Sequence, residues 1–208
     1  MRHLSPERLL AGLDRVRDSP PDRGRVILVV RRPRTGQREV ASQARLDLVT
    51  GLAGDNWLER GSRQTPGGSA DPDKQVTVMN ARIAELVSGG QDRMPLAGDQ
   101  LFVDLDLSVA NLPPGSLLMV GGAVLRVSAA PHLGCAKFVE RFGADAMRFV
   151  NSRTGRKLRL RGMNTSVVTA GPVRPGDLAV KVASGVLPGG PSPAAAAAAG
   201  PARAGQRS

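Results

Sequence analysis

The stretch Ser-Leu-Leu-Met-Val-Gly-Gly-Ala-Val-Leu-Arg-Val-Ser, residues 116–128, holds two apolar runs separated by a Gly-Gly pair. Two runs of β-favouring residues joined by two glycines predict a hairpin, because glycine accepts the positive φ angles of a tight two-residue turn. We therefore expect strands over residues 116–120 and 123–128. This hairpin places a β region in the second half of the chain, and the pattern on either side of it decides the class of fold.

Short runs of the same kind continue on both sides of the hairpin, separated by turn-forming residues. We expect further strands over residues 25–32, 40–48, 75–79, 101–107, 156–160, 166–170 and 178–182. Helical patterns are fewer and cover residues 6–17, residues 80–87 with Asn80 as the N-cap, and a segment after Cys135. Many short strands with few helices predict a mainly β fold, a closed β-barrel with a few short helices.

These patterns divide the chain into three parts. Residues 1–24 are predicted to form an N-terminal helical extension and residues 25–182 a β-barrel domain, while residues 183–208 are rich in Ala, Gly and Pro. This last segment buries too little apolar surface to repay its ordering entropy, so we expect a disordered tail. The glycine-rich stretch 61–74 predicts an exposed loop.

The chain lacks the patterns of a membrane or secreted protein. No apolar run approaches the ~20 residues that a membrane-spanning helix needs, and the charged first twenty residues lack the apolar stretch of a signal peptide. We therefore expect a cytoplasmic protein without membrane association.

The basic charge is unevenly distributed. The 208 residues include 29 basic and 18 acidic side chains, which gives a formal net charge of +11. Eight basic and two acidic residues fall within positions 137–161, immediately after the only cysteine. Two interpretations stay open for this patch, a solvated surface and a pocket for an anion, since guanidinium groups pair well with phosphate and other oxyanions. We expect only this patch to bear on mechanism and read the excess in residues 1–40 as an arginine-rich bias.

The single cysteine, Cys135, excludes an intrachain disulfide and a multi-cysteine metal site, and two histidines are too few for a histidine-rich one. Cys135 lies at the expected start of a helix, beside Lys137 and Arg141, where unpaired N–H groups and cations stabilise a thiolate. A thiolate can act as nucleophile, persulfide carrier or soft metal ligand; the alternative is a buried cysteine that only packs. His132 is a candidate to hydrogen-bond the sulfur or relay a proton, or else a surface turn residue.

The order of motifs resembles the MOSC domain, a family named for the C-terminal part of molybdenum-cofactor sulfurases. The resemblance covers about residues 25–182 and rests on Gly51-Leu52-Ala53-Gly54-Asp55, Gln75 to Met79, Pro95 to Leu107, Leu112-Pro113-Pro114-Gly115, Cys135 to Gly143, and Val173-Arg174-Pro175-Gly176-Asp177. The chain departs from many small family members at Gly98-Asp99-Gln100, where they have Gly-Glu-Asn.

The resemblance implies a MOSC or pyruvate-kinase-like barrel that binds the molybdenum cofactor, with Cys135 as metal ligand or persulfide carrier and catalytic partner of His132. The cofactor-binding residues that it favours are Lys137, Arg141, Arg159, Arg161, Asp55 and Asn164, with Asn56 a weaker candidate. For Asp55, Asn56 and Asn164, capping of their own backbone is the competing interpretation. No pyridoxal phosphate is expected, because the aminotransferase-type domain of longer members is missing.

Three functions follow. The first is a molybdenum-dependent oxidoreductase that reduces small N-hydroxylated substrates with electrons from a separate donor protein. The second is a sulfur carrier or cofactor-binding module without redox turnover. The third, a basic nucleic-acid-binding barrel, is disfavoured because one Trp, four Phe and no Tyr leave few side chains on which bases can stack.

Overall fold

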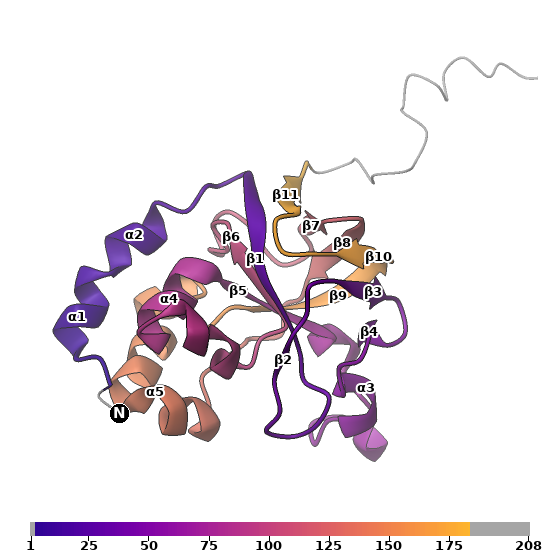
Figure 1. Cartoon of the computed structure of the whole chain (residues 1–208), viewed down its shortest axis with the longest axis horizontal. Coiled ribbons are helices and arrows are strands. Elements are labelled where there is room, and N and C mark those ends of the chain that lie inside the picture. Colours follow the sequence, from indigo (N-terminus) through magenta and orange to yellow (C-terminus); the bar gives the residue numbers. More distant parts are fainter. Residues whose placement is uncertain (1–2, 184–208) are drawn as a thin grey trace, which may run out of the picture.

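Seven strands of the protein close into a β-barrel, which lies beside a group of helices in Figure 1. The structure, a computed structural model, describes residues 3–183. The barrel strands are β1 (Arg23–Arg31), β5 (Val76–Asn80), β6 (Leu101–Asp104), β7 (Leu117–Val120), β8 (Ala123–Val127), β9 (Met163–Thr169) and β11 (Leu178–Val182). Their order around the barrel is β1, β6, β5, β9, β8, β7, β11, and pairing of β11 with β1 closes the ring. The predicted fold class is confirmed.

The barrel is mixed, because β5 and β6 pair in parallel, with Val78 opposite Leu101. A parallel pair needs a crossover connection, which α4 (Ala81–Ser88) and a 3-10 segment (Gln91–Ala97) supply here. The Asn80 side chain accepts hydrogen bonds from the backbone N–H groups of Arg82 and Ile83, at 2.9 and 3.1 Å. The predicted cap of this helix is confirmed.

The hairpin predicted from residues 116–128 is also confirmed. Strands β7 and β8 pair antiparallel with Val120 opposite Ala123. Gly121 between them has a φ of 57°, and a Cβ at this position would lie 2.7 Å from the carbonyl oxygen of Pro172. The turn therefore needs glycine both for its backbone angle and for the close approach of β10 (Gly171–Val173).

A second, three-stranded sheet flanks the barrel, with β3 (Ala44–Asp47) between β10 and β4 (Gly51–Leu52). The prediction of one strand over residues 40–48 is wrong. β2 (Glu39–Val40) pairs with β1, whereas β3 pairs with β10 and β4, and the chain bends between them. The two short strands have different partners, which an apolar run alone does not reveal.

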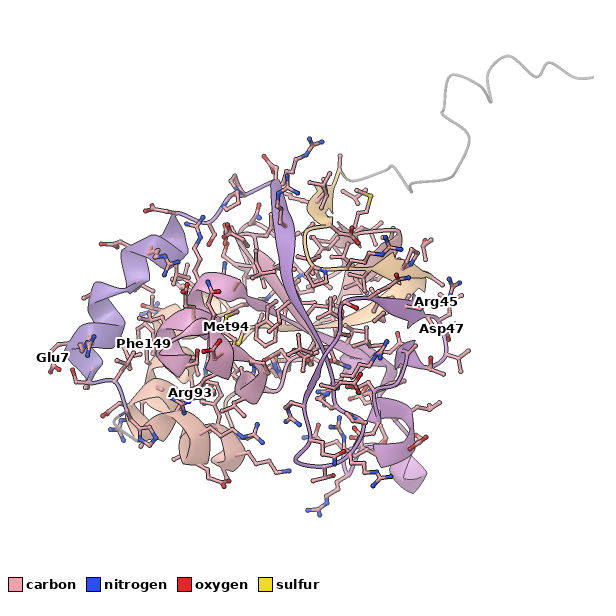
Figure 2. The ribbon with its side chains drawn as sticks, viewed as in Figure 1. Glu7, Arg45, Asp47, Arg93, Met94 and Phe149 are labelled. Carbon is pink, nitrogen blue, oxygen red and sulfur yellow. The ribbon has the colours of Figure 1, made fainter. Side chains whose placement is uncertain are left out.

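Two hydrophobic cores hold this arrangement together. The first fills the barrel and the second lies between its outer face and the helices α1 (Pro6–Ala11), α2 (Leu13–Arg17), α4 and α5 (Ala136–Asn151). Met94 and Phe149, labelled in Figure 2, pack in the second core. Phe138 and Phe142 of α5 are buried there with ring centroids 4.9 Å apart, so these two aromatic side chains contribute to packing.

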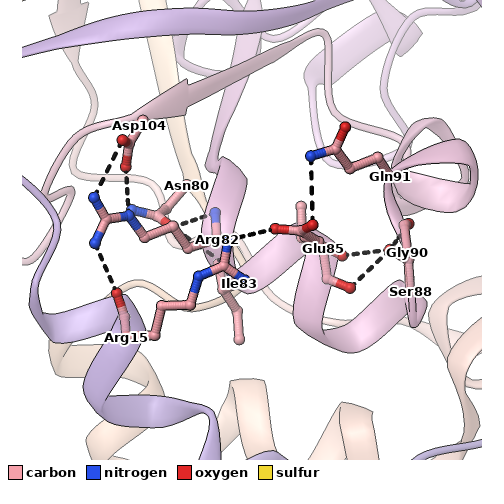
Figure 3. A network of polar contacts seen from close by, with 10 residues as sticks. Arg15, Asn80, Arg82, Ile83, Glu85, Ser88, Gly90, Gln91 and Asp104 are labelled. Carbon is pink, nitrogen blue, oxygen red and sulfur yellow. Dashed lines mark hydrogen bonds and ion pairs between the residues drawn. The ribbon is translucent and has the colours of Figure 1, made fainter.

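A polar network links α2 to α4 and to β6 (Figure 3). Arg82 binds both carboxylate oxygens of Asp104 at 2.7 and 3.2 Å and donates to the Arg15 carbonyl oxygen, while Arg15 pairs with Glu85 at 2.8 Å. The predicted helix over residues 6–17 is broken at Gly12, where a Cβ would lie 2.5 Å from the Leu86 side chain. Glycine at this position allows the chain between α1 and α2 to lie close to Leu86 of α4.

The strand predicted over residues 156–160 is wrong, because residues 153–157 form a helix, α6 (Arg153–Lys157), followed by a turn. The Ser152 hydroxyl accepts a hydrogen bond from the Gly155 N–H group at 2.9 Å and caps the helix. Gly155 is required, since a Cβ there would lie 2.4 Å from the Val150 carbonyl oxygen. Local capping thus outweighs the β pattern of the short run.

The remaining elements are short. α3 (Trp57–Arg60) follows the small sheet, and two 3-10 turns (Pro66–Gly68 and Pro72–Lys74) lie within the stretch predicted as an exposed loop. Across residues 3–183 no helix combines the length and the apolar character that crossing a membrane requires. Apart from Ala183, the predicted tail lies outside the described residues.

Candidate functional site

Cys135 occupies the N-cap of α5, as the sequence predicts, with its side chain exposed. Two asparagines fix the loop before it: Asn151 Oδ1 accepts a hydrogen bond from the Gly134 N–H group at 2.9 Å, and Asn164 Nδ2 donates to the carbonyl oxygens of Ala130 and Pro131, both at 3.2 Å. The backbone approaching the cysteine is therefore held by side chains of α5 and β9.

Cys135 opens onto a pocket that we call the basic pocket, with a volume of about 170 Å³. Its cationic lining residues are Arg32, Arg34, Arg38, Arg60, Lys137, Arg141 and Arg161. Among residues 3–183, no acidic side chain lines it. Buried carboxylates pair with Arg32 and Arg161, whereas no ion pair within residues 3–183 engages the other five cations. The arrangement favours an anion with more than one negative charge.

A buried ion pair anchors one wall of the basic pocket. Asp55 receives Arg32 Nε at 2.7 Å and Nη2 at 2.8 Å, and also the Trp57 N–H group at 3.0 Å. Arg32 Nη1 donates to the Gly98 carbonyl oxygen at 3.0 Å. Asp55 therefore both caps its own turn and fixes an arginine of the pocket, without itself lining the pocket.

Asp99 anchors another arginine of the basic pocket. Its fully buried carboxylate receives Arg161 Nη1 at 2.6 Å and lies 2.9 Å from His132 Nε2. Arg161 Nη2 donates to the Ala97 carbonyl oxygen, and the guanidinium carbon lies 5.2 Å from the centre of the Phe138 ring. The buried Gln100 side chain accepts from the Thr77 N–H group at 2.7 Å. The Asp-Gln pair, where the resemblance expects Glu-Asn, thus has structural partners of its own.

Burial and neighbouring charges shift the pKa values of several groups in and beside the basic pocket. Burial together with the neighbouring Arg141 and Arg32 lowers the pKa of Arg38 to about 10, and burial beside Arg32 lowers the pKa of Arg60. Burial would raise the pKa of Asp99, but Arg161 and His132 outweigh it, so the pKa is lowered. Burial and Arg161 lower the pKa of His132 against the opposing effect of Asp99.

Five of the residues singled out in the sequence line the basic pocket together: Cys135, His132, Lys137, Arg141 and Arg161. Asn56 also lines it, and its buried Oδ1 has no hydrogen-bond partner in the described part of the chain. Arg159 lies elsewhere and donates its Nη1 to the carbonyl oxygens of Leu112 and Leu107 at 2.6 and 3.3 Å. Asn164 supports the cysteine loop rather than the pocket lining.

Four arginines of the basic pocket were not expected from the sequence. Arg32, Arg34 and Arg38 come from the end of β1 and the arm that leads to β2, and Arg60 comes from α3. The expectation that only the patch after Cys135 bears on the site is therefore wrong, because the fold brings part of the N-terminal basic excess to the cysteine. The run Arg31-Arg32-Pro33-Arg34 was the available signal.

The environment of His132 predicts how the free energy of unfolding depends on pH. A histidine in an unfolded chain titrates near pH 6.5, whereas the pKa of His132 in the folded protein is lower. As the pH falls, the unfolded chain therefore takes up a proton at this histidine before the folded protein does. The free energy of unfolding should therefore fall as the pH drops below about 6.5, by at most about 1.4 kcal/mol per pH unit from this group. Urea unfolding of the protein and of His132→Gln at pH 7.5 and 5.5 measures the effect.

The variant should show a smaller loss between these two pH values, because His3, the other histidine, is present in both proteins. Equal losses would contradict the assignment of this dependence to His132.

The acidic, histidine and cysteine side chains do not gather elsewhere into a metal site: residues 3–183 contain no cluster of three or more of them that could hold an ion.

Comparison with known proteins identifies solved structures with a similar fold. No family model matches the chain, and no curated protein matches it. The solved structure of the YuaD protein from Bacillus subtilis is similar with a TM-score of 0.59 and 15% identity, over 77% of this chain and 97% of that one. A structure described only as a hypothetical protein is similar with a TM-score of 0.54 and 21% identity, over 77% and 68% of the two chains. At such identities the likeness concerns the fold; YuaD is a MOSC-domain protein, and the chain has a MOSC-like β-barrel fold.

Proposed function

We propose that the protein binds the molybdenum cofactor in the basic pocket, with the Cys135 thiolate as the protein ligand of the metal. The observation that carries the proposal is the meeting of the only cysteine with seven cationic side chains and no acidic one around a single cavity. A thiolate is a soft ligand suited to a transition metal, and arginines suit a phosphate.

The residues present fit such a group. The cofactor combines a pterin dithiolene with a phosphate, and the phosphate would be held by Arg38, Arg60, Lys137 and Arg141. Three buried polar atoms of the pocket residues have no partner in the described chain: Asn56 Oδ1, Arg38 Nε and Arg161 Nε. Buried polar atoms are rarely left unpaired in native proteins, so these three support a polar ligand with both donors and acceptors.

When bound, the cofactor supplies a metal centre capable of two-electron chemistry. Reduction of an N-hydroxylated base consumes two protons and two electrons, breaks the N–O bond and yields the amine and water. The neutral His132 donates Nε2–H to the ionised Asp99, which leaves Nδ1 able to accept a proton and pass it on. The electrons come from a separate donor protein.

A second candidate, carriage of sulfur as a persulfide on Cys135, is favoured by the exposure of the thiol. An exposed thiolate at a helix N-terminus can be reached by the sulfur of a donor protein and later by an acceptor. The two candidates share the same cysteine and differ in whether a metal is retained.

Cys135→Ala should lose the metal. Purified from a host that makes the cofactor, the wild-type protein is expected to hold molybdenum and pterin in about equal amounts, whereas the variant retains little molybdenum because the thiolate is missing. Elemental analysis and pterin fluorescence measure the two contents. Arg153→Ala, an exposed change on α6 outside the basic pocket, is the control and should keep both.

The other outcomes separate the candidates. Metal-free wild-type protein with cyanide-labile sulfur that disappears in Cys135→Ala would favour the persulfide carrier. Equal molybdenum in the wild type and the variant would show that Cys135 is not the ligand.

A further inference from the structure

A second cavity lies directly behind the loop that carries His132 and Cys135. It has a volume of about 300 Å³ and is bounded by the loop residues 128–133, by α6, and by the turn 159–163 that leads into β9. We call it the rear pocket. Its size falls at the lower end of the range for small-molecule sites, and most of its lining is apolar, as in such sites.

The rear pocket is separate from the basic pocket but shares a wall with it. His132 and Arg161 line both cavities, and Cys135 lines only the basic pocket. The loop between them is held by Asn164 from β9, which binds the carbonyl oxygens of Ala130 and Pro131. Hydrogen bonds from Asn164 therefore help to hold the wall between the two cavities.

The charged side chains that line the rear pocket are all cationic. They are Arg156, Arg159 and Arg161, which line it together with His132, and no acidic side chain of the described part of the chain lines it. Arg161 is already neutralised by Asp99, whereas Arg159 Nη1 donates to two carbonyl oxygens and to the Met163 sulfur, and Arg159 has no carboxylate partner among residues 3–183. Burial lowers the pKa of Arg159, with no carboxylate opposing the effect. A half-buried guanidinium beside apolar walls is suited to pair with the anionic group of a ligand whose remaining surface is apolar.

The backbone at Arg159 supports the same conclusion. Its φ is 48°, and no other non-glycine residue of the described chain has a positive φ. A side chain in this region is strained by about 1–2 kcal/mol, and such strain is concentrated at functional sites. The conformation turns the chain between α6 and β9 and places the guanidinium against the cavity.

We infer that the rear pocket binds a small organic anion, with an aromatic or short branched body against Ala129, Leu133 and Met163 and a carboxylate at Arg159 and Arg156. The apolar lining favours an apolar ligand body, and the two arginines, with no acidic side chain lining the pocket in the described chain, favour a negatively charged ligand group. The site is argued from its own residues and does not depend on the cofactor proposed for the basic pocket.

Benzoate and its neutral analogue benzyl alcohol are the probes. Titration of the full chain, followed by isothermal calorimetry and by amide NMR shifts, should show saturable benzoate binding with a Kd on the order of 1 mM or below. Benzyl alcohol, which fills the same space without the charge, should bind at least about fivefold more weakly. Absence of saturable benzoate binding, or equal affinities for the two probes, would overturn the inference.

Variants locate the site. Ala129→Trp fills the cavity from an exposed position and should abolish binding, and Arg159→Asn, a residue that tolerates the left-handed conformation, should weaken it about threefold or more. Arg153→Ala, on α6 outside the cavity, and Arg141→Ala, in the basic pocket, should leave the affinity unchanged.

Thermal unfolding of each variant shows that it remains folded. Binding lost in Arg141→Ala but kept in folded Ala129→Trp would place benzoate in the basic pocket and overturn the proposal.

Discussion

Asp99→Asn lowers the free energy of unfolding by about 3–5 kcal/mol, the expected cost of leaving a buried charge without its partner. Asp99 is fully buried and joins Arg161, itself only 6% exposed, to His132. An asparagine keeps the size of the side chain but not its charge, so the Arg161 guanidinium stays buried and uncompensated. Urea unfolding followed by circular dichroism measures the change.

Two further variants separate charge from packing. Asp99→Leu combined with Arg161→Met removes both charges and should recover much of the stability, because apolar side chains of similar volume often replace a buried ion pair without loss. Asp145→Asn removes a carboxylate from an exposed pair with Arg148 and should cost less than about 1 kcal/mol. A loss below about 1 kcal/mol for Asp99→Asn would show that the pair is not a stabilising element of this wall.

The second large effect is expected at Leu9. Leu9→Ala should destabilise the protein by about 2–5 kcal/mol, through lost burial and the cavity left in the second core. Leu9 has no exposed surface although it lies in the first of the N-terminal helices, whereas the next residue, Leu10, is 60% exposed. Leu10→Ala is therefore a control of the same chemistry, one position along the chain.

Leu10→Ala should change the free energy of unfolding by less than about 0.5 kcal/mol. Equal effects of the two substitutions would mean that α1 does not pack on α5 in solution as it does here. A large difference would show that the N-terminal segment, predicted from the sequence as a helical extension, supplies part of the core that packs against α4 and α5.

The sequence predicts the site where its residues are close along the chain. His132, Cys135, Lys137 and Arg141 fall within one loop and the first turns of one helix, so their spacing alone predicts that they meet. Arg34, Arg38 and Arg60 reach the same cavity only because β1 and the small sheet bring distant segments together. Such contacts are set by strand order, which periodicity does not determine.

The same distinction holds for the fold. The hairpin at Gly121-Gly122 and the cap at Asn80 are local features, and both are found as predicted. The run 156–160 has the composition of a strand, but the Ser152 cap and the close approach at Gly155 make it the end of a helix. Asp99 was marked as a departure from a family pattern, and its role as the partner of Arg161 and His132 depends on burial that the sequence does not show.

The pairing of β1 with β11 has a consequence for the way the chain folds during synthesis. It joins the first barrel strand to the last, with Arg23 opposite Val180, and Arg25 reaches the Gly176 carbonyl oxygen across 151 positions of sequence. One edge of β1 must therefore remain open until nearly the whole domain has left the ribosome. Contacts between distant segments slow folding and leave unpaired strand edges exposed to other chains. We therefore expect nascent chains that end before β11 to aggregate and to bind chaperones, whereas chains that include it fold.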